Sequence, residues 1–199
     1  GAAQKKWLEL LEVEIGNLRA AMNFYRSFRW RDEGLQMTAA LGFFWLRRGY
    51  YTEGKTWIET FLPDEAGEPT EAEVMALFWL SWIYLYLADL EHALDVTGRC
   101  FEKSRTLDFG EGMALSLSFC GYLERYRGQL EIGWEHCQRA VEIAFEADDP
   151  WTTIQSLYCG YTRPLPKGKK DIDLDRVRSK FESTIGELIK AEDVWGTAV

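Results

Sequence analysis

The chain has 199 residues, of which 47% are hydrophobic and 28% charged, a balance typical of a folded domain or a compact array of repeats. This composition excludes a disordered chain. Lysine and arginine number 23 against 32 aspartates and glutamates, giving a formal charge of −9, which disfavours direct binding along a nucleic-acid backbone. With two histidines and no recognised catalytic motif, we expect a binding module that is not an enzyme and that uses no cofactor or metal.

We expect neither a membrane-spanning helix nor a secretion signal in this sequence. The longest uncharged run, residues 74–88, is shorter than the roughly twenty apolar residues of a spanning helix, and we interpret it as a buried helix. The first residues lack a basic segment followed by an apolar core. We therefore expect a cytoplasmic protein without a membrane partner, and we expect this chain to be a fragment of a longer one.

The four cysteines lie inside apolar helical patterns and lack the short paired spacing of metal or redox motifs. They are Cys100, Cys120, Cys137 and Cys159. We expect all four to be reduced and mostly buried. An alternative stays open at His136, which adjoins Cys137: a composite metal site of these two with a cysteine of another unit, or a metal-dependent helical enzyme.

Apolar residues recur at three- and four-residue steps along the chain, which predicts successive helices and no strand. The first predicted helix covers residues 5–28, with an apolar stripe from Trp7 to Tyr25. Further helices are predicted at 32–48, 52–62, 70–87, 91–106, 111–126, 130–147, 150–162 and 174–191. Asp149 followed by Pro150 indicates a helix start, because aspartate caps the first turn and proline fits its first position.

A repeated pattern groups these helices into four units. A modest apolar residue followed by a small one recurs at intervals of 39, 40 and 39 residues, at Leu41-Gly42, Leu80-Ser81, Cys120-Gly121 and Cys159-Gly160. Two further columns of small residues follow, at Gly49, Ala88 and Gly128, and at Gly54, Ala93 and Gly133. Small residues let the two helices of a hairpin approach closely, and the first of these columns also lets the chain reverse.

The spacing therefore predicts an all-α fold, an α-α superhelix of about four antiparallel helical hairpins. We expect a single helical-repeat domain with units at 1–62, 70–107, 110–147 and 150–192. The order of residues resembles the tetratricopeptide repeat, a helix-turn-helix unit with a large residue, Leu-small, an aromatic and further small residues. The resemblance is carried in the second unit by Leu77, Leu80, Ser81, Tyr84, Ala88, Leu90 and Ala93, and in the third by Leu117, Cys120, Gly121, Gly128, Leu130, Gly133 and Ala140. Because the intervals exceed the usual 34 residues, we expect a longer and irregular relative of that repeat.

A second resemblance covers about the first sixty residues. Residues 11–22, 41–50 and 53–58 are similar to the repeat region downstream of the ATPase module in large bacterial signal-transduction ATPases, which include LuxR-type and antibiotic-regulatory transcription factors. The resemblance implies that the motor and DNA-binding domains lie elsewhere in the chain and that the repeats serve as sensor and contact surface. We therefore expect a protein-interaction or effector-sensing domain of a bacterial transcriptional regulator. Its partners would be proteins, peptides or other domains of the same chain.

The first helix of each unit is expected to line the concave face of a right-handed stack. Positions one, four and five after the small residue, together with the position three before it, give an aromatic set with two arginines. These candidate groove residues are Phe43, Arg47, Phe78, Trp82, Tyr86, Tyr122, Arg125, Tyr126 and Tyr161. Aromatic residues with arginine are typical of peptide-binding or interdomain surfaces. Two alternatives stay open: core packing between thick helices, and a small-molecule receptor whose groove closes around an apolar or aromatic effector.

Residues that follow the small position by four or five places should point away from the hairpin contact. We therefore expect Tyr86, Arg125 and Tyr126 to be accessible to solvent, and Trp45 and Tyr84 to be buried. Arg125 is expected to stack on neighbouring tyrosines and to anchor an acidic group of a partner. The competing interpretation is an internal ion pair of Arg125 with Glu124 or Glu131.

Overall fold

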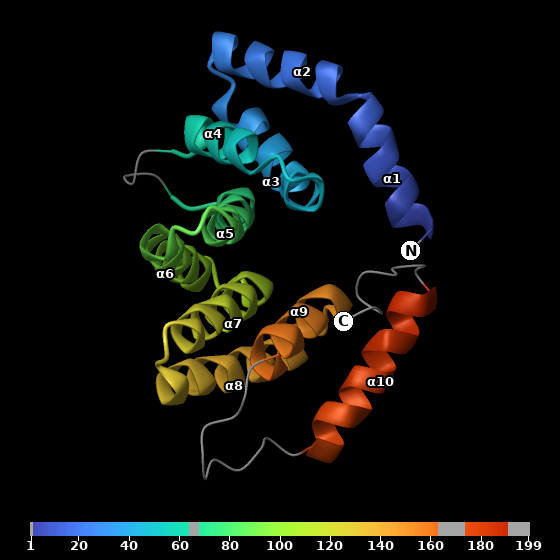
Figure 1. Cartoon of the computed structure of the whole chain (residues 1–199), viewed down its shortest axis with the longest axis vertical. Helices are drawn as coiled ribbons and strands as arrows, with labels where there is room; N and C mark the ends of the chain where they lie inside the picture. The colour runs from blue at the N-terminus through green and yellow to red at the C-terminus, as the bar shows by residue number, and fades with distance from the viewer. Residues whose placement is uncertain (1, 64–67, 163–173, 191–199) are drawn as a thin grey trace. The chain divides into compact units, whose positions relative to one another are not determined.

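The computed structural model describes residues 2–63, 68–162 and 174–190 (Figure 1). Every regular element in this part of the chain is an α-helix, which confirms the predicted all-α class. The helices are α1 (Ala2–Val13), α2 (Ile15–Phe28), α3 (Arg31–Arg48), α4 (Tyr51–Phe61), α5 (Glu71–Tyr86), α6 (Leu90–Thr106), α7 (Gly110–Tyr126), α8 (Leu130–Ala147), α9 (Pro150–Tyr161) and α10 (Leu174–Lys190). From α3 onward, each begins and ends within one residue of its predicted bounds. None of these described helices combines the length and apolar character that a membrane crossing requires.

The single helix predicted over residues 5–28 is wrong, because the chain turns between α1 and α2 (Figure 1). The break falls at Glu14, whose φ of −86° and ψ of 4° lie outside the helical region. Its carboxylate accepts a hydrogen bond from the side-chain amide of Asn17 at 2.5 Å. Gly16, a weak helix former, lies in the same turn. The helical period continues through this segment, so the apolar pattern alone did not reveal the break.

The chain divides into two compact units, Trp7–Gly112 and Met113–Val199, the second of which includes Gly1–Lys6. We call them the N-terminal unit and the C-terminal unit. The N-terminal unit contains most of α1 and all of α2 to α6. The C-terminal unit contains most of α7 and all of α8 to α10. The arrangement of all four hairpins as one domain stays a prediction.

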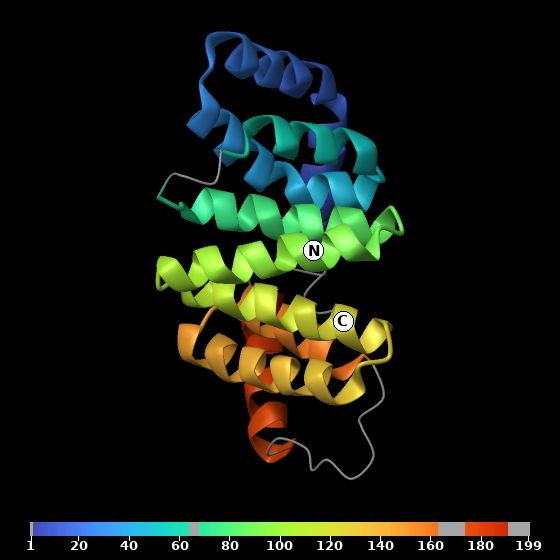
Figure 2. The ribbon, with the colours of Figure 1, turned by 90° about the vertical axis from the view of Figure 1, so that its left-hand side faces the viewer.

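Helix α5 forms the centre of the N-terminal unit. It packs against α3, α4 and α6, and Figure 2 shows it lying between the α3–α4 pair and α6. Its buried residues include Val74, Leu77, Leu80 and Ile83, which are all at most 2% exposed. The interpretation of the uncharged run as a buried helix is therefore confirmed.

The turns inside the hairpins share one backbone closure. Gly49, Ala88 and Gly128, the residues predicted to reverse the chain, have φ angles of 76°, 60° and 91°. In the α7–α8 turn, the N–H of Gln129 donates to the carbonyl oxygen of Glu124 at 2.9 Å. The other two turns contain the same bond, and this pattern is the Schellman motif. The predicted role of this small-residue column is confirmed.

The same closure occurs without glycine at two other turns, between α2 and α3 and between α6 and α7. Arg29 has a φ of 58° and Asp108 a φ of 53°. The following residues, Trp30 and Phe109, donate their N–H groups to carbonyl oxygens five residues back, at 2.9 Å in both cases. A left-handed conformation is uncommon for such residues. The main-chain bonds therefore hold these turns in a strained conformation.

The predicted close approach within a hairpin is confirmed between α7 and α8. A Cβ on Gly121 would lie 2.5 Å from the carbonyl oxygen of Gly133, and a Cβ on Gly133 would lie 2.5 Å from the carbonyl oxygen of Gly121. Real Cβ atoms do not approach an oxygen so closely. Only glycine on both helices allows the two backbones to touch.

Gly42 belongs to the same column as Gly121, but its neighbour differs. A Cβ on Gly42 would lie 2.0 Å from Cγ of Trp79 on α5, the first helix of the next unit. The prediction of a contact inside its own hairpin is therefore wrong at this position. The indole ring of Trp79 occupies the space that a side chain at position 42 would fill. The small residue therefore allows packing between two units at this position.

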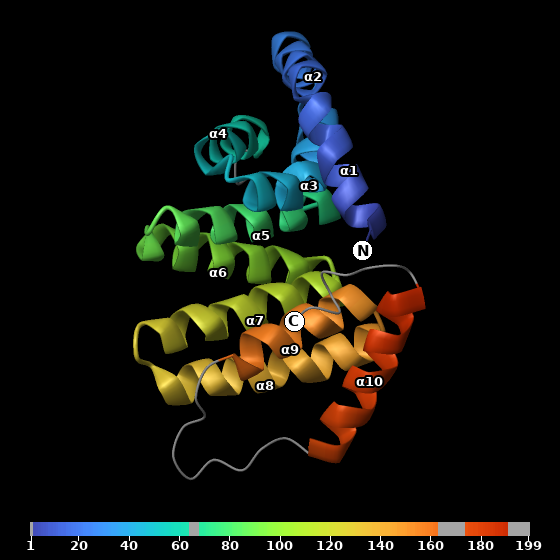
Figure 3. The same ribbon diagram turned by 45° about the vertical axis from the view of Figure 1, so that its right-hand side comes forward.

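In the C-terminal unit, the predicted start of α9 is confirmed. The carboxylate of Asp149 accepts a hydrogen bond from the N–H of Thr152 at 2.7 Å, and Pro150 occupies the first helical position. Figure 3 shows α10 lying beside α9. Asp148 pairs with Lys180 of α10, and this ion pair lowers the pKa of the Asp148 carboxyl.

Candidate functional site

Solvent exposure was predicted for five residues, and four of these predictions agree with the structure. Tyr86 and Tyr126 are 56% and 55% exposed, whereas Trp45 and Tyr84 are 1% and 7% exposed. These four expectations are confirmed. The expectation for Arg125 is wrong, because this side chain is only 3% exposed.

The N-terminal unit presents an aromatic face, which we define by Phe43, Arg47, Tyr51, Trp82 and Tyr86. Tyr86 stacks on Tyr51 with ring centroids 5.0 Å apart and planes inclined by 13°. Trp82, one turn before Tyr86 on α5, has its ring centroid 6.4 Å from that tyrosine. On α3, the guanidinium of the exposed Arg47 lies 5.9 Å from the ring centroid of Phe43.

Two members of this unit depart from the sequence-based selection. Tyr51 is absent from the predicted groove residues. It begins α4, the second helix of its unit, and the prediction covered the first helix of each unit. Its position two residues after the turn glycine Gly49 is the signal that could have found it. Phe78 was selected but is 3% exposed and packs against Trp79, with ring centroids 5.1 Å apart. Phe78 is therefore a core residue.

The remaining candidates lie in the C-terminal unit. Tyr122 is half-buried and stacks on Phe119 with ring centroids 6.0 Å apart, while Tyr126 stands exposed one turn later. The side chain of Tyr161 lies outside the described residues. A single groove that combines these tyrosines with the aromatic face stays a prediction.

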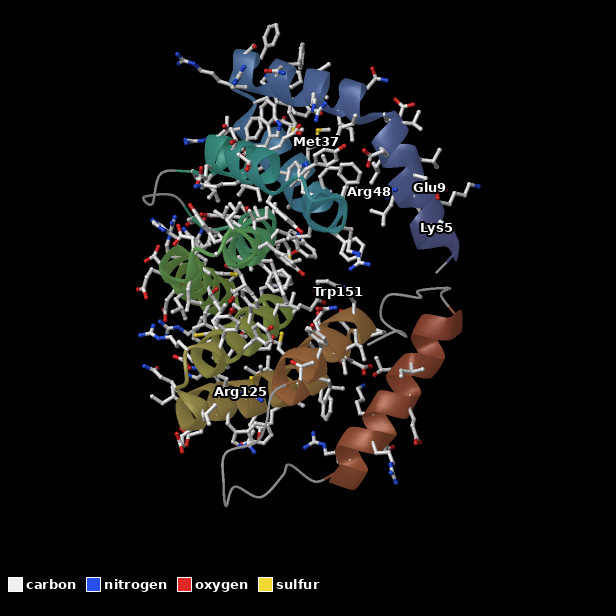
Figure 4. All side chains as sticks on the ribbon, viewed as in Figure 1. Lys5, Glu9, Met37, Arg48, Arg125 and Trp151 are labelled. Atoms are coloured by element: carbon white, nitrogen blue, oxygen red, sulfur yellow. The ribbon has the colours of Figure 1, made fainter. Side chains whose placement is uncertain are left out.

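Arg125 is turned into the C-terminal unit (Figure 4). Its Nη1 donates hydrogen bonds to the backbone carbonyl oxygens of Gly160 at 2.6 Å and Cys159 at 3.2 Å. Its guanidinium carbon also lies 5.8 Å from the ring centroid of Trp134 on α8. The last carbonyl groups of a helix have no partner within it and carry partial negative charge. The end of α9 thus binds the guanidinium of Arg125, which is therefore not available to anchor an acidic group of a partner.

One of the two acidic residues considered as partners of Arg125, Glu124, has another neighbour. Glu124 pairs with His136 of α8, with Nδ1 and Oε2 2.9 Å apart. Cys120 lies one turn before Glu124 on α7, and one ligand atom from each of Cys120, Glu124 and His136 lies within 4.8 Å of the others. The sequence left a site with Cys137 open, but the structure brings Cys120 to His136.

None of the four described cysteines forms a disulfide; three of them are buried and Cys120 is half-buried, in agreement with the prediction. Burial, together with the nearby charge of Glu124, raises the pKa of the Cys120 thiol to about 12. Burial likewise raises the pKa of Cys137 to about 11, against the opposing effect of Arg125. Neither group is a ready nucleophile at neutral pH.

A pocket between α2, α3 and α4 was not foreseen from the sequence. Its volume is about 250 Å³, and it is lined by Tyr25, Arg26, Arg29, Arg31, Thr60 and Phe61. Arg31 donates to the carbonyl oxygen of Leu62 at 2.9 Å, and the guanidinium of Arg26 lies 5.6 Å from the ring centroid of Trp57. Within the described part of the chain, no carboxylate pairs with Arg26 or Arg29. Three arginines thus share a pocket in a protein of net negative charge.

A polar network fastens α1 and α2 to α3 and α4. Arg19 donates to both carboxylate oxygens of Glu53, at 2.7 and 2.6 Å, which lowers the pKa of the Glu53 carboxyl. The hydroxyl of Tyr50 donates to Glu12 at 2.5 Å, and Arg48, labelled in Figure 4, lies 3.1 Å from the same carboxylate. These bonds hold the helices that surround the arginine pocket and the aromatic face.

The sequence is similar to part of three mycobacterial proteins. Two are "Putative HTH-type transcriptional regulator Rv0890c" and its counterpart MT0914 from Mycobacterium tuberculosis, and the third is Mb0914c from Mycobacterium bovis. Each is 27% identical over 155 residues, which are 74% of this chain but only 17% of the relative. This chain therefore corresponds to about a sixth of each regulator.

No model of a known protein family matches the sequence. Among solved structures, the crystal structure of BtubC (BKLC) from P. vanneervenii superposes with a TM-score of 0.56 and 16% identity, over 95% of this chain and 72% of that one. At this identity the likeness shows a shared fold. Taken together, the comparisons relate the chain to a segment of proteins named "Putative HTH-type transcriptional regulator" and show that it shares a fold with BtubC.

Proposed function

We propose that the chain is a tetratricopeptide-like contact domain of a bacterial transcriptional regulator, that it binds another protein segment through the aromatic face, and that it performs no catalysis. The regulator would belong to the signal-transduction ATPase class that residues 11–22, 41–50 and 53–58 resemble, and it would act in the cytoplasm. The observation that carries the proposal is the stack of the exposed Tyr86 on the half-buried Tyr51, beside the half-buried Trp82. The similarity to proteins named "Putative HTH-type transcriptional regulator", of whose length the match covers 17%, adds support.

The aromatic face has the chemistry of a contact surface. Tyrosine and tryptophan supply a large apolar area with little conformational freedom to lose, which is why they dominate interface energetics. The ring stacking fixes Tyr86 before any partner arrives, so binding costs less ordering of this side chain. Arg47 on α3, which belongs to the same face, would bind a carboxylate of the partner. The most direct partner is another domain of the same regulator.

The experiment replaces Tyr86 by alanine in the full-length regulator and measures transcription of its target genes, with the stability of the isolated chain measured in parallel. The matched control is Ile132→Ala, which removes a side chain that is 50% exposed on α8. We expect Tyr86→Ala to change the response at unchanged stability, and the control to change neither. An unchanged response in Tyr86→Ala and in the double variant with Trp82→Ala would refute the proposal.

The arginine pocket favours a second candidate function, the sensing of a small effector. A cleft of about 250 Å³ lies near the small end of ligand sites, and arginine binds carboxylates and phosphates through paired donors. The effector would thus be anionic, in contrast to the apolar ligand considered for the groove. Tyr25 and Phe61 would cover its carbon skeleton.

Thermal unfolding with a panel of phosphate esters and carboxylic acids tests this second function. Binding to the folded state raises the midpoint by an amount that grows with ligand concentration. Arg29→Gln should abolish the shift, while Arg127→Gln, an exposed arginine at the α7–α8 turn, should preserve it. A shift that survives Arg29→Gln together with Arg26→Gln would place the ligand elsewhere.

A further inference from the structure

Three side chains of metal-ligand type meet where α7 contacts α8. Cys120 and Glu124 lie one turn apart on the same face of α7, and His136 reaches them from α8. The thiol sulfur, a carboxylate oxygen and an imidazole nitrogen all lie within 4.8 Å of one another. None of the three takes part in the aromatic face or in the arginine pocket.

We propose that Cys120, Glu124 and His136 bind a divalent transition-metal ion, and that Zn²⁺ is the ion that fits best. Thiolate, imidazole and carboxylate are the three protein ligand types that zinc accepts. Mg²⁺ and Ca²⁺ prefer oxygen ligands throughout, so a site with sulfur and nitrogen selects against them. The inference is independent of the proposed regulatory contact.

The distances suit one ion. Zinc binds sulfur at about 2.3 Å and nitrogen or oxygen at about 2.0–2.2 Å, so two ligand atoms of one tetrahedral ion lie about 3.3–3.7 Å apart. Ligand atoms that already lie within 4.8 Å of each other need only small side-chain rotations to close on the ion. Three protein ligands leave the fourth tetrahedral position for water or for a group from a partner.

The backbone around the site is fixed without the ion. Gly121, next to Cys120, touches the backbone of Gly133 on α8, which sets the separation of the two helices. Arg125, next to Glu124, is tied to the carbonyl oxygen of Gly160 and points away toward α9. The ligands are thus carried on helices that are already held together, and such preorganisation favours a metal site.

The site is also open enough for an ion to enter. The side chains of His136 and Glu124 are 36% and 16% exposed, and Cys120 is half-buried. Binding requires the thiolate, so the Cys120 proton passes to the solvent when the sulfur–metal bond forms. The bound cation would compensate the negative charges of this thiolate and of the Glu124 carboxylate.

Cobalt(II) is the probe, because it is visible in zinc sites and takes the same geometry. We expect one equivalent of Co²⁺ to give the near-ultraviolet band of a thiolate–cobalt bond together with intense tetrahedral d–d bands, and Zn²⁺ to displace it. Cys120→Ser should lose the thiolate band, and His136→Ala should weaken binding at least tenfold. Cys159→Ser, a buried cysteine outside the site, should leave binding unchanged.

Circular dichroism and urea unfolding of each variant establish that it is folded. Zn²⁺ should raise the melting temperature of the unmodified chain but not that of folded Cys120→Ser. Absence of a thiolate–cobalt band in the unmodified chain would overturn the proposal. So would a band that survives Cys120→Ser but disappears in Cys137→Ser, because the ion would then use the other thiol.

Discussion

The guanidinium of Arg125 on α7 donates a hydrogen bond of 2.6 Å to the backbone carbonyl oxygen of Gly160 in the last turn of α9. The bond joins the first helices of two successive units across 35 residues of chain. The arginine is only 3% exposed, and the carbonyl groups of α9 together with the face of Trp134 stabilise its charge. Arg125 is therefore a structural residue of the C-terminal unit.

Replacing Arg125 by alanine should destabilise the chain by about 2–4 kcal/mol, because two helix-terminal carbonyl groups lose their donor in a buried site. Tyr126→Ala, one residue further and 55% exposed, should change the stability by less than about 0.5 kcal/mol. Urea unfolding of both variants measures the difference. Equal losses would mean that the bonds of Arg125 to α9 contribute nothing.

Replacing Gly121 by alanine should destabilise by about 1–3 kcal/mol, because the new methyl group would overlap the Gly133 carbonyl oxygen. Gly121→Leu should destabilise the chain by more than Gly121→Ala, because its side chain is larger. Gly67, a loop glycine of interest for comparison, lies outside the described residues, so the control is Gly98 on α6, which has no atom within 4 Å of an added Cβ. Gly98→Ala should stabilise by up to about 1 kcal/mol, because alanine favours a helix. The same sign for both changes would contradict the backbone contact.

The turn residues permit a reciprocal test. Ala88 adopts a φ of 60° and Gly128 a φ of 91°, a region in which a side chain costs roughly 1 kcal/mol or more. Ala88→Gly should therefore stabilise the chain or leave it unchanged, whereas Gly128→Ala should destabilise by about 1 kcal/mol. Both are read from denaturant midpoints, and a clear loss in Ala88→Gly would show that the turn is not strained.

Alkylation tests the state of the thiols. At pH 8, a thiol of pKa about 12 is ionised about a thousandfold less than one of ordinary pKa. Iodoacetamide should therefore modify native Cys120 slowly and the buried cysteines more slowly still, while four groups react after denaturation. A disulfide in the protein purified without oxidant, or a fast native thiol, would contradict this prediction.

Acid should weaken the bond between Arg19 and Glu53. The folded state holds the pKa of Glu53 below its usual range, so the carboxylate contributes stability above its unfolded pKa and loses it as pH falls through the folded value. Arg19→Gln should thus lower the melting temperature at pH 7 but have little effect at pH 2, where the carboxyl is protonated in both proteins. An equal decrease in melting temperature at both pH values would mean that Arg19 stabilises the chain through packing and not through its bond to Glu53.

The helices and turns could be predicted because their signals are local. Apolar spacing, the Asp149-Pro150 start and the small residues at Gly49, Ala88 and Gly128 act within one or two turns of chain. These features decide whether a segment is helical and where it stops. They explain why eight helices, from α3 to α10, were placed to within a residue.

What the sequence did not reveal depends on contacts between distant residues. The inward turn of Arg125 follows from the carbonyl groups at the end of α9, and the neighbour of Gly42 follows from the position of Trp79. The arginine pocket likewise forms because α2, α3 and α4 converge. A periodic pattern identifies which face of a helix is apolar, but it does not state which helix will cover that face.

The turns of this protein are closed by main-chain hydrogen bonds, and residues as different as Arg29, Ala88, Asp108 and Gly128 occupy the same left-handed position. The conformation of such a turn depends far more on the number of residues between the two helices than on the identity of those residues. Sequence can therefore drift at the turns while each helix keeps its direction and its offset from the previous one. The lengths of the connections, and not the residues within them, therefore set how one helix follows another in this chain.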